Sequence, residues 1–235
     1  MNYIDFIGQY WPEYLTGLWV TLQLAFFALL LGLPIGTGLA LLGLHTSRLL
    51  RYTTIGIVEI GRGIPSIVVL YLVYFGLPEA GITLDAYAAA IVGLAFTTAA
   101  YSSEIIRAGI QEVPVGQFEA SSALALSWRR QMQLVILPQA ISKVVPPLIA
   151  LSIGIFQATA LAYAITVPEL LSRAYQIATL TYQWTPALIT AGAVYAVFTI
   201  TLTVLTRLAR RLSRRAEAPA TPAPPTTKEN HEVLV

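Results

Sequence analysis

Apolar stretches long enough to cross a lipid bilayer dominate this sequence. The first one, at about residues 15–44, contains no Asp, Glu, Lys or Arg. A helix of about 20 predominantly apolar residues covers the hydrocarbon core of a membrane. Of the 235 residues, 56% are hydrophobic and 11% are charged, whereas soluble domains are about 25% charged. These apolar residues need lipid around them, which excludes a soluble enzyme, a collagen-like fibre and a disordered regulator.

Five such stretches predict an all-α integral membrane protein with about five transmembrane helices. They lie at about residues 15–44, 55–77, 86–110, 134–164 and 186–208. Arg62 and Pro65 interrupt the second stretch, and several glycines around Pro34 indicate a kink or a strong tilt in the first.

Lysine and arginine gather in alternate loops, which predicts the orientation of the chain in its membrane. Arg48 and Arg51 follow the first span, Arg129 and Arg130 precede the fourth, and five arginines follow the fifth. The other loops carry mostly acidic residues. We therefore expect the N-terminus outside and the C-terminus in the cytoplasm.

Three segments are expected along the chain. Residues 1–13 mix aromatic rings with few charges and predict a short helix in the outer interface, because such rings favour headgroup depth. Residues 14–215 form the transmembrane domain. Residues 216–235 are rich in Pro, Ala and Thr, which predicts a disordered cytoplasmic tail because this composition buries too little apolar surface.

Several kinds of chemistry lack the residues that they need. The chain has no cysteine, which removes disulfides, thiolate metal sites and cysteine nucleophiles. His45 lies in a loop and His231 in the tail, so no metal site and no catalytic residues are expected. Ser66 would suit an intramembrane hydrolase only if a histidine in a later span activated it, and no later span contains one. A net charge of +2 gives no indication of nucleic acid as a partner.

The sequence also lacks a phosphate-binding loop of the GxxxxGK[ST] kind. Its two lysines are Lys143 and Lys228, and neither follows a glycine. Transport against a gradient would therefore take its energy from a partner or from an ion.

The loop before the fourth span predicts a short helix, a tight turn and a second helix. Pro114 suits the first turn of a helix, residues 115–126 are helix formers, and Ser127 suits the N-cap of the second helix. From the residues alone, two interpretations remain open. The segment either transmits a push from a soluble partner or is a connecting loop lying on the lipid headgroups.

This segment and the start of the fourth span carry a recognisable pattern. Its residues are Gly116, Gln117, Glu119, Ala120, Leu124 and Ser127, followed by Leu137, Pro138, Gln139 and Ala140. They resemble the EAA motif of ATP-binding cassette (ABC) importer permeases, in particular of the polar amino acid uptake subfamily (histidine/glutamine/glutamate type). The family pattern is roughly GQ-x-EAA-x-x-LG-x-S, followed by an LPQA-type stretch.

Further motifs agree in order, so that the resemblance covers roughly residues 14–210. Residues 62–65 resemble the Arg-Gly-Thr-Pro of the subfamily, and residues 100–110 resemble its Ala-Tyr-x-x-Glu-x-x-Arg-Gly-Gly-Ile. Two departures stand out. Ala125 replaces a glycine of the pattern, and Gln157 with Ala158 replaces the Lys-Asp pair that the family often has. The second departure predicts a more neutral substrate path and leaves room for a specialised solute.

The resemblance implies a type I ABC importer permease fold with a cytoplasmic coupling helix in residues 114–130. It implies a bacterial cytoplasmic (inner) membrane, a dimer with itself or a sister permease, and an extracytoplasmic solute-binding protein. Partner ATPase subunits would bind ATP and Mg, whereas this chain would bind no cofactor and catalyse nothing. The cargo would be a polar amino acid or a similar small polar solute.

The resemblance also assigns candidate site residues. The expected ATPase-coupling residues are Gly116, Gln117, Glu119, Ala120, Leu124, Ala125 and Ser127. The expected residues of the substrate path or gate are Arg62, Pro65, Glu104, Arg107, Gln157 and Thr159.

Structural roles for the path residues stay open. Glu104 and Arg107 are spaced for a salt bridge within one helix. Glu59 is placed to neutralise Arg62, and Gln157 suits a hydrogen bond between helices.

Two other functions compete with this interpretation. A small ion-coupled carrier or channel would transport solute without any ATPase. An ABC permease for a non-amino-acid solute, such as an osmoprotectant, is also compatible with the changed residues at 157–161.

Overall fold

The computed structural model describes the backbone of residues 2–216 and the side chains of residues 2–208. This part of the chain is helical throughout, with no β-strand, which confirms the predicted fold class. The elements are α1 (Tyr3–Gly43), α2 (Arg48–Gly63), α3 (Ser66–Tyr71), η1 (Leu72–Gly76), η2 (Leu77–Ala80), α4 (Ala86–Gln111), α5 (Val115–Ala123), α6 (Trp128–Gln131), η3 (Met132–Ile136), α7 (Leu137–Ala158), η4 (Thr159–Ile165), α8 (Leu170–Thr181) and α9 (Trp184–Ala216). The predicted tail at 216–235 lies outside the described residues, except for Ala216.

Four helical runs are long and apolar enough to cross a membrane, and a fifth is broken. The four are Tyr3–Gly43, Ala86–Gln111, Trp128–Ile165 and Trp184–Leu208. The broken one joins α2 to the segment Ser66–Ala80 at an angle of 98°. Pro65 explains the break, because proline lacks an N–H group and disfavours helical geometry in the residue before it. The four continuous spans and one interrupted span predicted from the sequence agree with this arrangement.

Close packing between α1 and α4 holds the centre of the bundle together. Small residues recur every four positions along the buried face of α1, at Ala28, Gly32, Gly36 and Ala40. A Cβ atom on Gly32 would lie 2.7 Å from the carbonyl oxygen of Ala95, and one on Gly36 would lie 2.7 Å from that of Ala99. Small residues at this spacing let two membrane helices approach closely. The chain remains helical through the glycines around Pro34, and two of them, Gly32 and Gly36, serve this contact.

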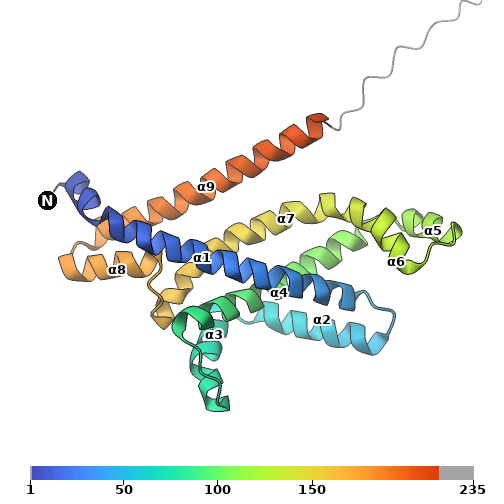
Figure 1. The fold of residues 1–235 in the computed structure, drawn as a ribbon, viewed down its shortest axis with the longest axis horizontal. Helices are drawn as coiled ribbons and strands as arrows, with labels where there is room; N and C mark the ends of the chain where they lie inside the picture. The colour runs from blue at the N-terminus through green and yellow to red at the C-terminus, as the bar shows by residue number, and fades with distance from the viewer. Residues whose placement is uncertain (1, 217–235) are drawn as a thin grey trace, which may run out of the picture.

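The N-terminal segment belongs to the first helix. The boundary expected at residue 13 is not a break, because α1 runs from Tyr3 with Pro12 inside it. Its first turns are bent relative to the rest of α1 (Figure 1). Phe6 is fully buried among residues of α8 and α9. Further along, a Cβ atom on Gly17 would lie 2.9 Å from the Cα of Leu170, so α1 also packs tightly against the start of α8.

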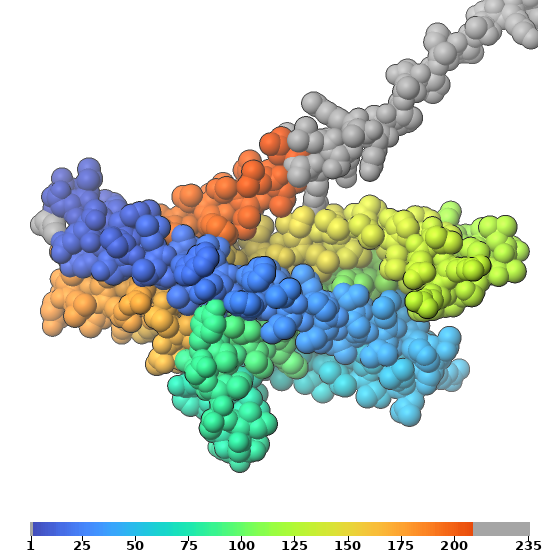
Figure 2. All heavy atoms as spheres, in the orientation of Figure 1, coloured from blue at the N-terminus to red at the C-terminus, as the bar shows by residue number. Residues whose placement is uncertain are grey.

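The bundle has two distinct ends and two projecting parts. The N-terminus and α8 lie at one end, whereas α5, α6 and the turn between α1 and α2 lie at the other (Figure 1). The segment α3–η1–η2 projects from the side of the bundle, and α9 leaves it at an angle (Figures 1 and 2). Apolar side chains on the outer part of α9, such as Val197 and Ile200, are exposed, as expected for a helix in contact with lipid.

Candidate coupling site and solute path

The helix–turn–helix predicted before the fourth span is present. Pro114 is the N-cap of α5, and Ser127 is the N-cap of α6. The first helix ends at Ala123 instead of continuing to residue 126. The two short helices form the tip of one end of the bundle (Figures 1 and 2).

Helix α5 has an outer and an inner face. All the predicted coupling residues are exposed, namely Gly116, Gln117, Glu119, Ala120, Leu124, Ala125 and Ser127. Phe118 instead packs against the buried cluster that contains Ile110 and Ile136. Ser121 is only 2% exposed, and its hydroxyl donates to the carbonyl of Gln117 over 2.7 Å. The outer face is therefore available to a partner, while the inner face anchors the helix to α4 and α7.

Exposed apolar side chains extend this outer face beyond the predicted residues. Val115 is 69% exposed, Leu124 is 75% exposed and Trp128 is 59% exposed. Arg129 and Arg130 are exposed beside them. A group of exposed apolar side chains rimmed by charges is typical of a protein-binding surface. Of these, only Leu124 belongs to the quoted motif, so the motif did not identify the other four.

Arg62, the first residue proposed for the path, lies at the break between α2 and α3. Its Nη1 donates to Oε1 of Glu59 over 2.9 Å, as the spacing predicted. The hydroxyl of Tyr101 donates to the carbonyl of Arg62 over 3.3 Å, and the guanidinium lies 5.9 Å from the centre of that ring. Tyr101 lies in the second half of α4, so the break packs against that helix. A charge within a membrane-spanning segment normally faces protein or water.

Glu104 and Arg107 form the expected ion pair within α4. Arg107 donates from Nη2 to Oε1 over 2.7 Å and from Nε to Oε2 over 3.0 Å. The side chain of Glu104 is 26% exposed and that of Arg107 is 22% exposed. They line a narrow crevice with residues of α1 and α2, including Gly43 and Thr54. The charges are thus satisfied locally, in a place where α1, α2 and α4 meet.

Gln157 and Thr159 contact different elements from the charged pairs. Nε2 of Gln157 lies 3.4 Å from Oγ1 of Thr199, which joins the end of α7 to α9. Thr159 is fully buried, and its hydroxyl donates to the carbonyl of Phe156 over 2.7 Å. In this conformation, therefore, both side chains make contacts within the helical bundle.

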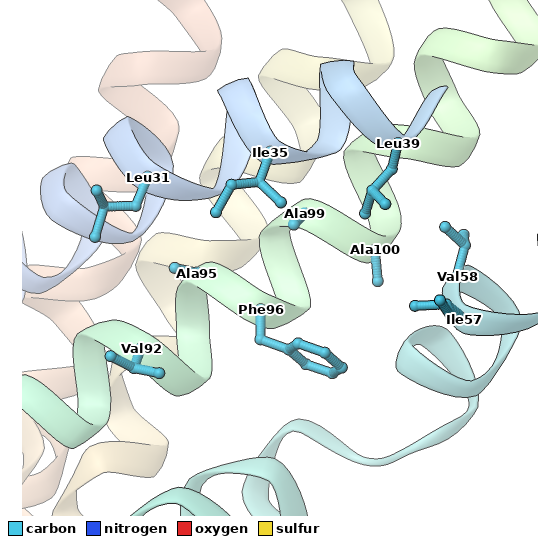
Figure 3. Close-up of a pocket in the computed structure, with 10 residues that line it drawn as sticks. All are labelled: Leu31, Ile35, Leu39, Ile57, Val58, Val92, Ala95, Phe96, Ala99 and Ala100. Carbon is cyan, nitrogen blue, oxygen red and sulfur yellow. The ribbon is translucent and has the colours of Figure 1, made fainter. Parts of the chain in front are cut away.

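An apolar cavity of about 370 Å³ lies between α1, α2 and α4 (Figure 3). Its wall consists of aliphatic side chains and the ring of Phe96, with Leu31 and Ile35 from α1 and Val58 from α2. These side chains offer no hydrogen-bonding group to a polar solute. The cavity therefore suits a hydrocarbon chain rather than a polar cargo.

A polar cavity of about 520 Å³ lies between α3, η4 and α8. Its polar lining residues are uncharged, and they are Tyr71, Tyr163, Thr166, Ser172 and Gln176. Hydroxyl and amide groups on the wall of a cavity can hydrogen-bond a small polar molecule. The path residues predicted from the sequence do not line this cavity, whose residues come from three separated segments of the chain.

Glu169 is a buried carboxylate between the last two spans, outside the membrane-spanning segments. It caps α8 by accepting from the backbone N–H groups of Leu171 over 2.8 Å and Ser172 over 2.6 Å. Its Oε2 also accepts from the hydroxyl of Tyr195 over 2.8 Å. Burial raises the pKa of the Glu169 carboxyl, although these hydrogen bonds act in the opposite direction. The sequence signal was a glutamate directly before an apolar run, a helix N-cap position.

The raised pKa of Glu169 predicts a pH-dependent stability. Because the folded-state pKa lies above the unfolded-state pKa, the carboxyl contributes stability below the unfolded value and loses it as pH rises through the folded value. As the pH rises from about 4 to about 7, we expect the thermal midpoint of the wild type to decrease by more than that of Glu169→Gln. Glu13→Gln, at an exposed site, serves as the control. Parallel curves for wild type and Glu169→Gln would contradict this assignment.

Comparison with known families identifies the chain. The family model described as the binding-protein-dependent transport system inner membrane component matches residues 32–214. The chain belongs to this family. It is accordingly a multi-pass permease component of the inner membrane.

Individual permeases and solved structures agree with this assignment. The chain is 36% identical over 193 residues to the arginine transport system permease protein ArtQ of Bacillus subtilis (strain 168), covering 82% of this chain and 88% of that protein. It is 35% identical over 210 residues to the nopaline transport system permease protein NocM of Agrobacterium fabrum (strain C58), covering 85% and 87%, respectively.

The fold is shared with solved ABC transporter structures. A crystal structure of an amino acid ABC transporter with histidines matches with a TM-score of 0.84 at 33% identity, covering 90% of this chain and 98% of that one. An inward-facing conformation of the MetNI methionine ABC transporter matches with a TM-score of 0.67 at 23% identity, covering 85% and 97%, and supports the fold alone. The predicted type I importer permease fold is thereby confirmed.

The permease departs from its family pattern at Ala125, and the structure shows what this departure does. Ala125 has a φ of 53°, in the left-handed region. The N–H of Leu126 donates to the carbonyl of Ser121 over 3.3 Å, and that of Ala125 to the carbonyl of Ser122 over 2.9 Å, which closes the end of α5. Helices commonly end in this way with a glycine. Alanine in this geometry is strained by about 1–2 kcal/mol.

We expect Ala125→Gly to stabilise the permease by about 1 kcal/mol, because glycine relieves the left-handed strain at some cost in chain entropy. Thermal unfolding of the purified protein measures the change. Ala123→Gly is the matched control. It removes the same methyl group inside α5 and should destabilise by up to about 1 kcal/mol. Shifts of the same sign in both variants would contradict the role given to residue 125.

Proposed function

We propose that this permease is the membrane-spanning subunit of an ATP-driven importer for a polar amino acid or a similar small polar solute. Separate ATPase subunits would bind ATP and Mg and dock on α5. The permease would pair with itself or a sister permease and receive solute from an external binding protein. Two relatives named for arginine and nopaline transport support a cargo of this class.

The exposure of the outer face of α5 is the observation that carries this proposal. A short helix lies at one end of the bundle and is anchored from behind by Phe118. This helix and the turn that follows it expose every predicted coupling residue. The turn between α1 and α2 lies at the same end (Figure 1), and Arg48 and Arg51 follow it at the start of α2. Because positive loops face the cytoplasm, we propose that α5 lies inside the cell, where ATPase subunits are available, and that the N-terminus lies outside.

The cargo proposed here is neutral overall or zwitterionic. The polar cavity between α3, η4 and α8 offers hydroxyl and amide groups, and Gln157 stands where the related pattern often has a charge. The ion pairs of Arg62 and Arg107 lie beside the broken span, and with Pro65 they are proposed to form part of the gate. A gate of this kind would rearrange when the bundle changes between inward-facing and outward-facing states. Thr159 would enter the path only in another conformation, because it is buried in this one.

Reconstitution into lipid vesicles tests the proposal. We expect vesicles that contain only the permease to take up no labelled polar amino acid, with or without an ion gradient. Addition of the ATPase subunits, ATP and the binding protein should produce uptake. Gradient-driven uptake by the permease alone would overturn the proposal in favour of an ion-coupled carrier.

A further inference from the structure

A buried glutamine joins the coupling helix to the helix that follows it. Gln131 ends α6 and is only 8% exposed. Its Nε2 lies 2.7 Å from the carbonyl oxygen of Phe118 and 2.5 Å from Oγ of Ser121, both on α5. It also lies 3.3 Å from Oγ of Ser122. One side-chain amide thus faces three acceptors on the inner side and end of the coupling helix.

Two other polar contacts near this junction are exposed to water. Gln139 donates to Oε1 of Gln117 over 3.1 Å, and Nζ of Lys143 lies 3.8 Å from Oε2 of Glu112. Both are exposed contacts, which contribute little because water competes for the same groups. Hydrogen bonds shielded from water are stronger and keep their partners in one arrangement. Gln131 is therefore better shielded from water in its contacts with α5 than Gln139 is in its contact with Gln117.

The backbone carries this connection into the membrane. Residues Trp128–Ile165 form one membrane-spanning run, in which α6 passes through the π-helix η3 into α7. Displacement of α5 would therefore move Gln131 and, through it, the start of this run. The apolar contact of Phe118 with the cluster around Ile136 lies directly behind the same bonds.

We propose that Gln131 is the positioning residue that transmits movement of the coupling helix to transmembrane helix α7. This inference rests on the proposed function, because it assigns a path for the push that an ATPase delivers to α5. Gln131 does not contact the ATPase or the solute. Its role is to keep α5 and α6 moving as one body, so that ATP hydrolysis and solute movement stay coupled.

The test measures solute transported per ATP hydrolysed in vesicles that contain the whole complex. Gln131→Met keeps the length of the side chain but removes its donor. We expect it to assemble with the ATPase subunits and to hydrolyse ATP, while the transport ratio falls about tenfold. The matched control is Gln133→Met, the same substitution at an exposed position two residues away. It should leave the ratio unchanged.

A second variant separates transmission from folding. Ser121→Ala removes one acceptor and should lower the ratio in part, whereas adding it to Gln131→Met should cause little further loss. An unchanged ratio in Gln131→Met would overturn the inference. So would failure of both Gln131→Met and Ser121→Ala to assemble, because the glutamine would then have a purely structural role. If the wild-type complex shows no ATP-dependent uptake, the proposed function fails instead, which is a distinguishable result.

Discussion

Replacing Glu119 with lysine is expected to leave the permease inserted in the membrane but to detach or uncouple its ATPase subunits. Glu119 is exposed on the outer face of α5, away from the contacts of Phe118 that anchor the helix. Folding of the permease should therefore be unaffected. Reversal of a charge inside a docked interface costs about 2–5 kcal/mol, which corresponds to a loss of about thirtyfold or more in affinity.

Co-purification of the ATPase subunits and ATP-dependent uptake both measure this loss. Glu79→Lys is the matched control, because Glu79 is an exposed glutamate on the projecting segment, in η2. It makes the same charge reversal on a different part of the surface and should leave both readouts unchanged. Normal ATPase binding and uptake in Glu119→Lys would show that this face of α5 is not the coupling surface.

Gly36→Leu is expected to abolish folding or to reduce the free energy of unfolding by about 3 kcal/mol or more. Even a Cβ atom at this position would overlap Oγ of Ser102 and would lie 2.7 Å from the carbonyl oxygen of Ala99. The second atom belongs to the backbone of α4 and cannot rotate away. Leucine would therefore force the two central helices apart.

Gly38 lies two residues further along the same helix and provides the control. A Cβ atom on Gly38 meets nothing within 4 Å, and the residue is exposed. Gly38→Leu should fold normally and gain up to about 1 kcal/mol from the higher helix propensity of leucine. Thermal unfolding and yield of monodisperse protein in detergent compare the two variants. Similar behaviour of both would show that α1 and α4 are not packed as described.

The membrane spans could be predicted because bilayer thickness sets the minimum length of an apolar helix that crosses it, whatever that helix packs against. The turn of the coupling segment could be predicted for a related reason, since Pro114 and Ser127 act on their own local backbone. The role of Gly36 could not, because a glycine that permits a kink and one that permits a close contact look identical until the partner helix is known. The sequence alone does not show that α4 packs against α1.

The polar cavity was missed for the same physical reason. Its residues Tyr71, Tyr163 and Gln176 belong to three elements that only the tertiary fold brings together. The sequence around Gln131 gives only weak evidence that this side chain is buried. Gln131 is a polar residue followed by Met132 on a helix that enters the membrane, and its partners lie only 10 and 13 positions earlier. Burial of that amide depends on how α5 folds back, which local propensity does not specify.

The length of α1 has a mechanical consequence. Measured along the helix, its 41 residues amount to about 60 Å, twice the roughly 30 Å thickness of the hydrocarbon core. Near one end its backbone abuts α8 at Gly17, and further along it abuts α4 at Gly32 and Gly36. Between these two contacts α1 joins α8 to α4, so we expect these two parts of the bundle to move together. In the proposed transport cycle, widening at one end of the bundle would then accompany narrowing at the other.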